Sequence, residues 1–215
     1  MKRILLPLLA LLCAGLLGSA AAAPAAPVEG ADYVVIDGGV PYQPVAGKVE
    51  VAEVFGYTCP HCARFEAPLA AWARKLPAGA RFVAIPAPFG GYWMPYARAY
   101  FAAQALGLTT RTHAAMFRAL HEENRLPISD ATPTEIATFY ASYGVPATRF
   151  LAAYQAPAVD AQLKKASEFI DRSGVEGTPT LVVAGKYRVT ARSQDDTLRV
   201  ARWLVDRELA ARRKR

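Results

Sequence analysis

The chain has 215 residues, 53% of them hydrophobic, and a formal net charge of +7. This apolar content can fill a sizeable core, which excludes an intrinsically disordered chain. Part of the positive charge lies at the two ends of the chain, and no basic stretch is interleaved with aromatic residues, so we expect no nucleic-acid partner.

Residues 1–23 have the pattern of a secretory signal peptide. Lys2 and Arg3 form a positively charged start, residues 4–18 form an apolar segment, and residues 19–23 are small residues that suit cleavage. A single membrane anchor is the alternative, but the apolar run is short for a membrane span and no charged residue ends it. We therefore expect an exported protein from which this segment is removed.

Hydrophobic periodicity in the rest of the chain predicts two regions that mix strands with helices, and a helical stretch between them. A leader covers residues 24–44 and includes a short strand at 33–36. The further predicted strands are 48–57, 81–87, 180–183 and 187–190. The predicted helices are 60–76, 97–105, 111–123, 134–143, 147–154, 159–173 and 195–211.

This order of elements predicts an α/β protein with a thioredoxin-like fold and an inserted all-helical domain. A β-α-β half and a β-β-α half are separated by the helical stretch, which is the arrangement that such an insertion produces. We place the thioredoxin-like domain at residues 45–95 and 160–212 and the helical insertion at residues 96–159.

Once the signal segment and its Cys13 are removed, the only cysteines are Cys59 and Cys62. Disulfides form and persist in exported proteins. A disulfide between residues this close in sequence closes too small a loop to restrain the unfolded chain, so it adds little stability. We therefore interpret the pair as chemical rather than structural.

The motif Cys59-Pro60-His61-Cys62 lies where a predicted strand ends and a predicted helix begins. The first turn of a helix has unpaired N–H groups and the positive end of the helix dipole, which stabilise a thiolate at Cys59. Pro60 suits this turn because it has no N–H to leave unpaired. His61 brings a second donor, or a positive charge, close to the thiolate.

Half of a zinc site is the alternative interpretation of this motif. A structural zinc ion takes about four ligands, and the chain offers only His61, His113 and His121 besides the two cysteines. We therefore expect neither a metal nor another cofactor.

Glu53 shares one face of the predicted strand with Val51 and Phe55. A carboxylate on an apolar face is unfavourable unless it has a partner or a function. We predict a buried acid beneath the cysteines, with a raised pKa, that exchanges a proton with Cys62. An acid at the sheet edge, or one paired with a lysine, is the alternative.

Thr178 and Pro179 come directly before the predicted strand 180–183. A proline that enters a core strand is awkward in the trans form. A cis bond would form a tight turn opposite the cysteines, where its backbone could pair with a bound peptide.

Together these residues resemble the DsbA family of periplasmic disulfide oxidoreductases over roughly residues 45–210. The resemblance rests on Glu53-Val54-Phe55, on Cys59-Pro60-His61-Cys62, on Gly177-Thr178-Pro179-Thr180-Leu181-Val182-Val183 and on Gly185-Lys186-Tyr187.

The resemblance implies a periplasmic monomer in which Cys59 is the exposed nucleophile, Cys62 its buried partner, Glu53 the buried acid and Thr178-Pro179 the cis-proline loop. Such an enzyme donates its disulfide to newly exported, unfolded proteins that contain cysteine. A DsbB-like membrane protein then reoxidises it and passes the electrons to quinone.

Two further features bear on the environment of the site. Family members can carry a lysine near the buried acid, but Arg81 is the only charged residue between positions 80 and 88. The aromatic segment 89–95 either lines a peptide groove or packs between the frame and the insertion.

Two other functions use the same fold. An exported reductase or isomerase would run the exchange in the opposite sense, and Thr178 before the proline also occurs in such relatives. Those relatives usually carry a separate dimerisation module, for which the leader leaves no room. A non-catalytic peptide-binding factor is the third hypothesis, but such a factor has no need of Cys59 and Cys62.

Overall fold

The computed structural model describes residues 25–213, so the predicted signal segment, Cys13 and the last two residues of the basic run lie outside the described residues. Five strands form one sheet in the order β1-β5-β4-β2-β3. β2 pairs in parallel with β3, and the other neighbours are antiparallel. The strands are β1 (Tyr33–Val35), β2 (Val49–Phe55), β3 (Ala80–Pro86), β4 (Thr180–Val183) and β5 (Tyr187–Val189).

The helices confirm the predicted order of elements. They are α1 (Pro60–Ala73), α2 (Met94–Ala105), α3 (Thr109–His121), α4 (Pro133–Ala141), α5 (Ala147–Tyr154), α6 (Pro157–Arg172) and α7 (Gln194–Arg213), with a short 3-10 helix at Gly91–Trp93. None of the helices in residues 25–213 is long and apolar enough to cross a membrane.

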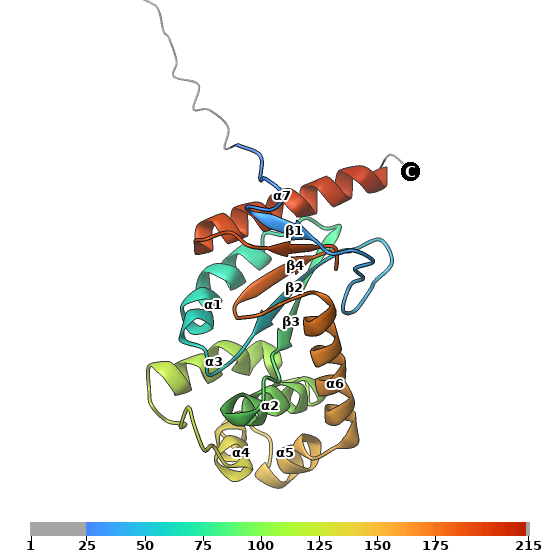
Figure 1. Ribbon diagram of the computed structural model, residues 1–215. Helices are drawn as coiled ribbons and strands as arrows, with labels where there is room; N and C mark the ends of the chain where they lie inside the picture. The colour runs from blue at the N-terminus through green and yellow to red at the C-terminus, as the bar shows by residue number, and fades with distance from the viewer. Residues whose placement is uncertain (1–24, 214–215) are drawn as a thin grey trace, which may run out of the picture.

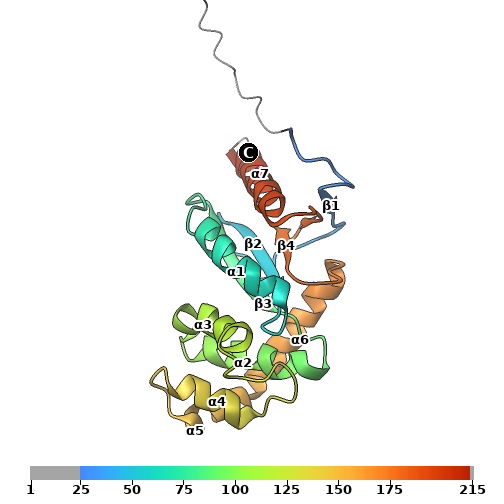
Figure 2. The ribbon, with the colours of Figure 1, turned by 90° about the vertical axis from the view of Figure 1, so that its left-hand side faces the viewer.

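The sheet lies between two groups of helices (Figures 1 and 2). On one face, Val51 of β2 packs with Phe65 of α1 and Leu204 of α7 in a common core. On the other face, Ala52 and Val54 join a larger core with α2, α3, α4, α5 and α6. The sheet therefore has both faces buried, and every residue of β2 is buried.

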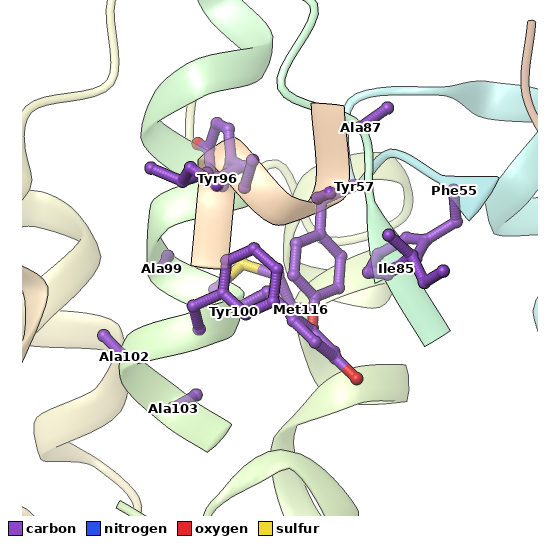
Figure 3. Close-up of a cluster of buried hydrophobic side chains, with 14 of the residues drawn as sticks. Phe55, Tyr57, Ile85, Ala87, Tyr96, Ala99, Tyr100, Ala102, Ala103 and Met116 are labelled. Atoms are coloured by element: carbon purple, nitrogen blue, oxygen red, sulfur yellow. The ribbon is translucent and has the colours of Figure 1, made fainter. Parts of the chain in front are cut away.

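The larger core is where the helical insertion meets the end of β2 (Figure 3). Tyr57 and Tyr100 lie close together there, with ring centroids 6.3 Å apart, and Phe55 packs edge-on against both rings. Alanines on α2, such as Ala99 and Ala102, let the helix approach this aromatic cluster closely.

Several predicted boundaries differ from those in the structure. α1 ends at Ala73 and not at residue 76, because the N–H groups of Arg74 and Lys75 bond back into turns ahead of Pro77. α2 begins before the predicted residue 97, since Pro95 lies in its first turn, where a proline is tolerated. α6 runs without a break through residues 159–160, so the predicted domain limit there would cut a helix.

Candidate active site

Cys59 lies between β2 and α1, at the position that caps the N-terminus of the helix. The backbone N–H of Cys62 donates to the Cys59 sulfur at 3.4 Å, and Pro60 occupies the first helical position. The sequence dictates this local geometry, because proline is pre-organised for the first turn and a side-chain acceptor at the cap satisfies a free N–H.

The environment of Cys59 favours its thiolate and lowers the pKa to about 5. A hydrogen bond from the Cys62 thiol makes the largest contribution, and burial opposes it. The Thr178 side chain and the N–H groups of Cys62 and His61 stabilise the charge further. Cys59 therefore carries a thiolate at neutral pH, which makes it a good leaving group in thiol–disulfide exchange.

Cys62 has the opposite character. Its side chain is fully buried, and this burial raises the pKa of the thiol far above its ordinary value, an effect that the hydrogen bond to Cys59 increases. Cys59 and Cys62 are not joined by a disulfide in the structure, which therefore represents the reduced form. The pair is therefore asymmetric: one sulfur holds the negative charge and the other holds the proton.

Glu53 is buried in the middle of β2, where it lies opposite Ala84 of β3 and Leu181 of β4. Burial, together with the smaller effects of the nearby charges of Glu66 and Cys59, raises the pKa of its carboxyl to about 8. The carboxyl is therefore mostly protonated at neutral pH and can give a proton to a neighbouring sulfur.

Arg81 does not serve as the cation for this acid. Its guanidinium bonds to the Gln43 carbonyl and lies 3.7 Å from the carboxylate of Glu50, which is a different buried acid. Glu50 in turn accepts the backbone N–H groups of Tyr42 and Gln43. Within residues 25–213, Glu53 makes no salt bridge with any lysine or arginine. The structure therefore does not support the alternative prediction that Glu53 pairs with a lysine.

Glu53 reaches water through a cavity of about 640 Å³ between α1 and α3. Glu66 and Arg74 of α1 and His113 of α3 also line this cavity. Burial raises the pKa of Glu66 as well. The cavity offers a path along which a proton on Glu53 can exchange with solvent.

His61 is exposed, and its side chain turns toward Arg64, whose Nη2 lies 2.9 Å from His61 Nδ1. The contribution of His61 to the Cys59 thiolate comes through its backbone N–H. The motif residue was predicted to bring a donor or a charge to the thiolate, and the donor in the structure belongs to the main chain.

Thr178 and Pro179 are joined by the predicted cis peptide bond. The carbonyl of Thr178 lies 3.5 Å from the Cys59 sulfur, so the turn faces the cysteines. Beside it lies a groove of about 350 Å³, whose lining includes Phe65, Pro179 and Arg192. This groove can accept an extended peptide next to the nucleophile.

The aromatic segment 89–95 packs against the frame, which is one of the two roles predicted for it. Trp93 packs on Gly56, where any added Cβ would come within 1.9 Å of the indole ring. The rings of Phe89 and Tyr92 are tilted against Trp93, with centroid distances of 5.3 and 5.9 Å, and remain 44% and 48% exposed. The segment thus closes the junction between the frame and the insertion and leaves two aromatic rings at the surface.

Sequence reasoning missed two sets of residues around the site. Glu66 follows Cys62 by four residues on α1, so the two side chains lie on the same face of the helix. This spacing could have identified Glu66 as a neighbour of the motif. His113 and His121 were considered only as zinc ligands, but both contact Tyr57. Their partners come from elements that only tertiary packing brings together.

Comparison with known proteins finds similarity to thiol:disulfide interchange proteins over most of the chain. A family model described as Thioredoxin matches residues 44–201. The thiol:disulfide interchange protein DsbA of Pseudomonas aeruginosa is 40% identical over 189 residues, which cover 86% of this chain and 87% of that protein. DsbA of Azotobacter vinelandii is 39% identical and covers 85% of each chain. The crystal structure of the oxidoreductase DsbA from Xylella fastidiosa superposes with a TM-score of 0.84 at 49% identity, over 86% of this chain and 98% of that one.

Proposed function

The chain belongs to the DsbA family and is a thiol:disulfide oxidoreductase, and we propose that it uses Cys59 and Cys62 to donate a disulfide to newly exported proteins. The asymmetry of the pair carries this proposal. A thiolate on Cys59 and a proton on Cys62 stabilise the reduced form relative to the disulfide, so the disulfide is readily passed to a substrate.

The reaction has two exchange steps. A substrate thiolate attacks the Cys59 sulfur of the Cys59–Cys62 disulfide, and Cys62 leaves and takes up a proton, which Glu53 supplies. A second substrate thiolate then attacks the substrate sulfur of the mixed disulfide, and Cys59 leaves as a stable thiolate. The substrate is oxidised by two electrons, and the enzyme is left with a thiolate and a thiol.

The substrate binds along the groove beside the cis-proline loop. The backbone of Thr178 pairs with an extended peptide, and the groove beside Phe65 and Arg192 holds a neighbouring side chain. Client proteins that are unfolded and contain cysteine fit this site, because the pairing uses main-chain groups and does not depend on one side chain.

The setting of the reaction follows from the predicted signal segment 1–23. We place the enzyme in the periplasm as a monomer, where a DsbB-like membrane protein linked to quinone reoxidises Cys59 and Cys62. No cofactor is needed in this chain, since the electrons pass between sulfur atoms.

Mixed-disulfide trapping tests the exchange reaction. A Cys62→Ser variant keeps the Cys59 thiolate but cannot form the intramolecular disulfide. It should accumulate covalent complexes with exported proteins that a reductant releases, and Cys59→Ser should accumulate none. Failure of Cys62→Ser to trap any protein would support a non-catalytic peptide-binding factor.

The direction of the reaction is tested by the reduction potential of the mature domain in glutathione buffers. A potential well above that of the glutathione couple supports a disulfide donor. A potential near or below about −270 mV, the value typical of thioredoxin, would show that the protein is an exported reductase.

A further inference from the structure

Tyr57 lies in the loop between β2 and the nucleophile, and α3 of the insertion holds it at both ends. His121 Nε2 lies 2.7 Å from the Tyr57 carbonyl oxygen. His113 Nδ1 lies 2.9 Å from the Tyr57 hydroxyl. The exchange reaction described above uses neither histidine, although both are directed at a residue only two positions from Cys59.

The chemistry of these groups defines the hydrogen bonds. A carbonyl oxygen only accepts, so Nε2 of His121 carries the proton and donates a hydrogen bond to the Tyr57 carbonyl. Burial lowers the pKa of His113 to about 4 and keeps the pKa of Tyr57 well above its ordinary value. The second contact is therefore a hydrogen bond between two neutral groups at physiological pH.

Packing leaves Tyr57 no second position. Its side chain is 2% exposed, and its ring packs against both Phe55 and Phe117, with centroid distances of 5.1 and 5.0 Å. On the other side of the loop, Gly56 is covered by Trp93. A displaced ring would leave a cavity in a densely packed cluster, which is unfavourable.

The position of this loop governs the position of the nucleophile. The N–H of Cys59 donates to the Gly56 carbonyl at 3.1 Å, which ties Cys59 to the same short loop. The Cys59 sulfur lies 3.4 Å from the Cys62 nitrogen and 3.5 Å from the Thr178 oxygen. A shift of less than 1 Å would weaken the contact with the Cys62 N–H, which stabilises the thiolate, because hydrogen bonds weaken steeply as distance and angle depart from the optimum.

We propose that His121 and His113 are positioning residues for the reaction: they hold Tyr57, and through it residues 56–58, so that the Cys59 sulfur stays at the N-terminus of α1. The helical insertion thereby takes part in tuning the nucleophile, although none of its side chains touches the sulfur. This inference rests on the proposed role of Cys59 as the reactive thiolate.

Substitutions of His121 separate hydrogen bonding from packing. His121→Leu keeps the volume of the side chain and removes the donor, and the acid ionisation constant of Cys59 should fall about tenfold, which corresponds to about 1.4 kcal/mol. His121→Gln retains an N–H donor and should restore most of the ionisation. The measurement is the ultraviolet absorbance of the thiolate as a function of pH in the reduced mature protein.

Leu120→Ala is the matched control. Leu120 lies next to His121 on α3 and is buried, so its truncation destabilises the same helix without removing a hydrogen bond to the loop. This variant should lose folding stability but retain the ionisation of Cys59. Equal effects of Leu120→Ala and His121→Leu on the ionisation would overturn the proposal, because they would show a general loss of packing.

Tyr57→Phe provides a second test if His121→Leu does not fold. It removes only the hydroxyl that meets His113, and the ionisation constant should fall about threefold, which corresponds to about 0.65 kcal/mol and lies within the net contribution of one hydrogen bond. Unchanged ionisation in the folded variants would overturn the positioning role. The wild-type protein shows separately whether the proposed function holds: if wild-type Cys59 does not ionise at acidic pH, the exchange proposal itself fails.

Discussion

The thioredoxin-like frame holds every side chain that reacts in the proposed exchange, whereas the helical insertion α2–α5 holds a core of alanines and aromatic rings. In the frame, the properties of Cys59 depend on a few donors at one helix end. In the insertion, Tyr140 and Phe150 stack with ring centroids 4.2 Å apart, and both are fully buried. Reactivity and stability therefore have different physical origins in the two regions, and substitutions should separate them.

The largest effect is expected from Cys59→Ser in the frame. A hydroxyl at this position forms no disulfide and stays protonated at neutral pH, so the rate of disulfide transfer to a reduced substrate protein should fall by more than about a thousandfold. The reduced variant should also unfold at a lower temperature than the reduced wild type at pH 7, because it lacks the stabilised Cys59 thiolate. Substantial remaining activity would show that another group carries the exchange.

A large loss of stability, without a loss of exchange activity, is expected from Phe150→Ala in the insertion. Removing this buried ring should lower the free energy of unfolding by about 3 kcal/mol, because apolar contacts are lost and a cavity remains. Denaturant unfolding measures this change, with Phe150→Leu as a milder control. The reduction potential of the folded variant should stay at the wild-type value, and a clear shift would contradict the separation of the two regions.

The pH dependence of stability tests the frame alone. The pKa of Cys59 is lowered from about 9 to about 5, so its contribution to the reduced protein is complete above about pH 9 and is lost as pH falls through about 5. The stability difference between the reduced and oxidised proteins should therefore decrease by about 2 kcal/mol from pH 7 to pH 5. Paired denaturant titrations measure it, and a constant difference would show that Cys59 is not a thiolate.

The smallest effect is expected from Glu53→Gln. The amide has the shape of the protonated acid but transfers no proton, so the step in which Cys62 takes up a proton should slow about tenfold, somewhat less than general acids commonly contribute. Stopped-flow reduction of the oxidised enzyme by a substrate thiol measures this rate.

The same variant has a second expected signature. The pKa of Glu53 is raised from 4.5 to about 8, so its favourable contribution is present below about pH 4.5 and is lost as pH rises through 8. Glu53→Gln should therefore lose less stability than the wild type over that range. An identical pH profile in both proteins would show that Glu53 is not a buried, protonated acid.

Local signals predicted elements in both the frame and the insertion, and the accuracy of their limits depended on the residues that flank them. The strand 180–183 and the helix 147–154 were predicted with their observed limits, because a proline or glycine marks the start of each. Predictions of helix ends without such a marker were less accurate. At α1 the apolar pattern continues to Leu76, but the helical hydrogen bonds end earlier. The domain limits and the roles of the site residues remain predictions.

The sequence by itself determined that Cys59 and Cys62 lie at a helix N-terminus, that Glu53 is buried and that a cis-proline turn precedes β4. Each of these depends on neighbours within a few residues, through the geometry of the first helical turn or the two-residue period of a strand. Only the tertiary structure decided that Thr178 faces Cys59, that Arg81 pairs with Glu50, and that His113 and His121 hold Tyr57. These contacts join residues far apart along the chain, and only the packing of the sheet against the insertion determines which of them meet.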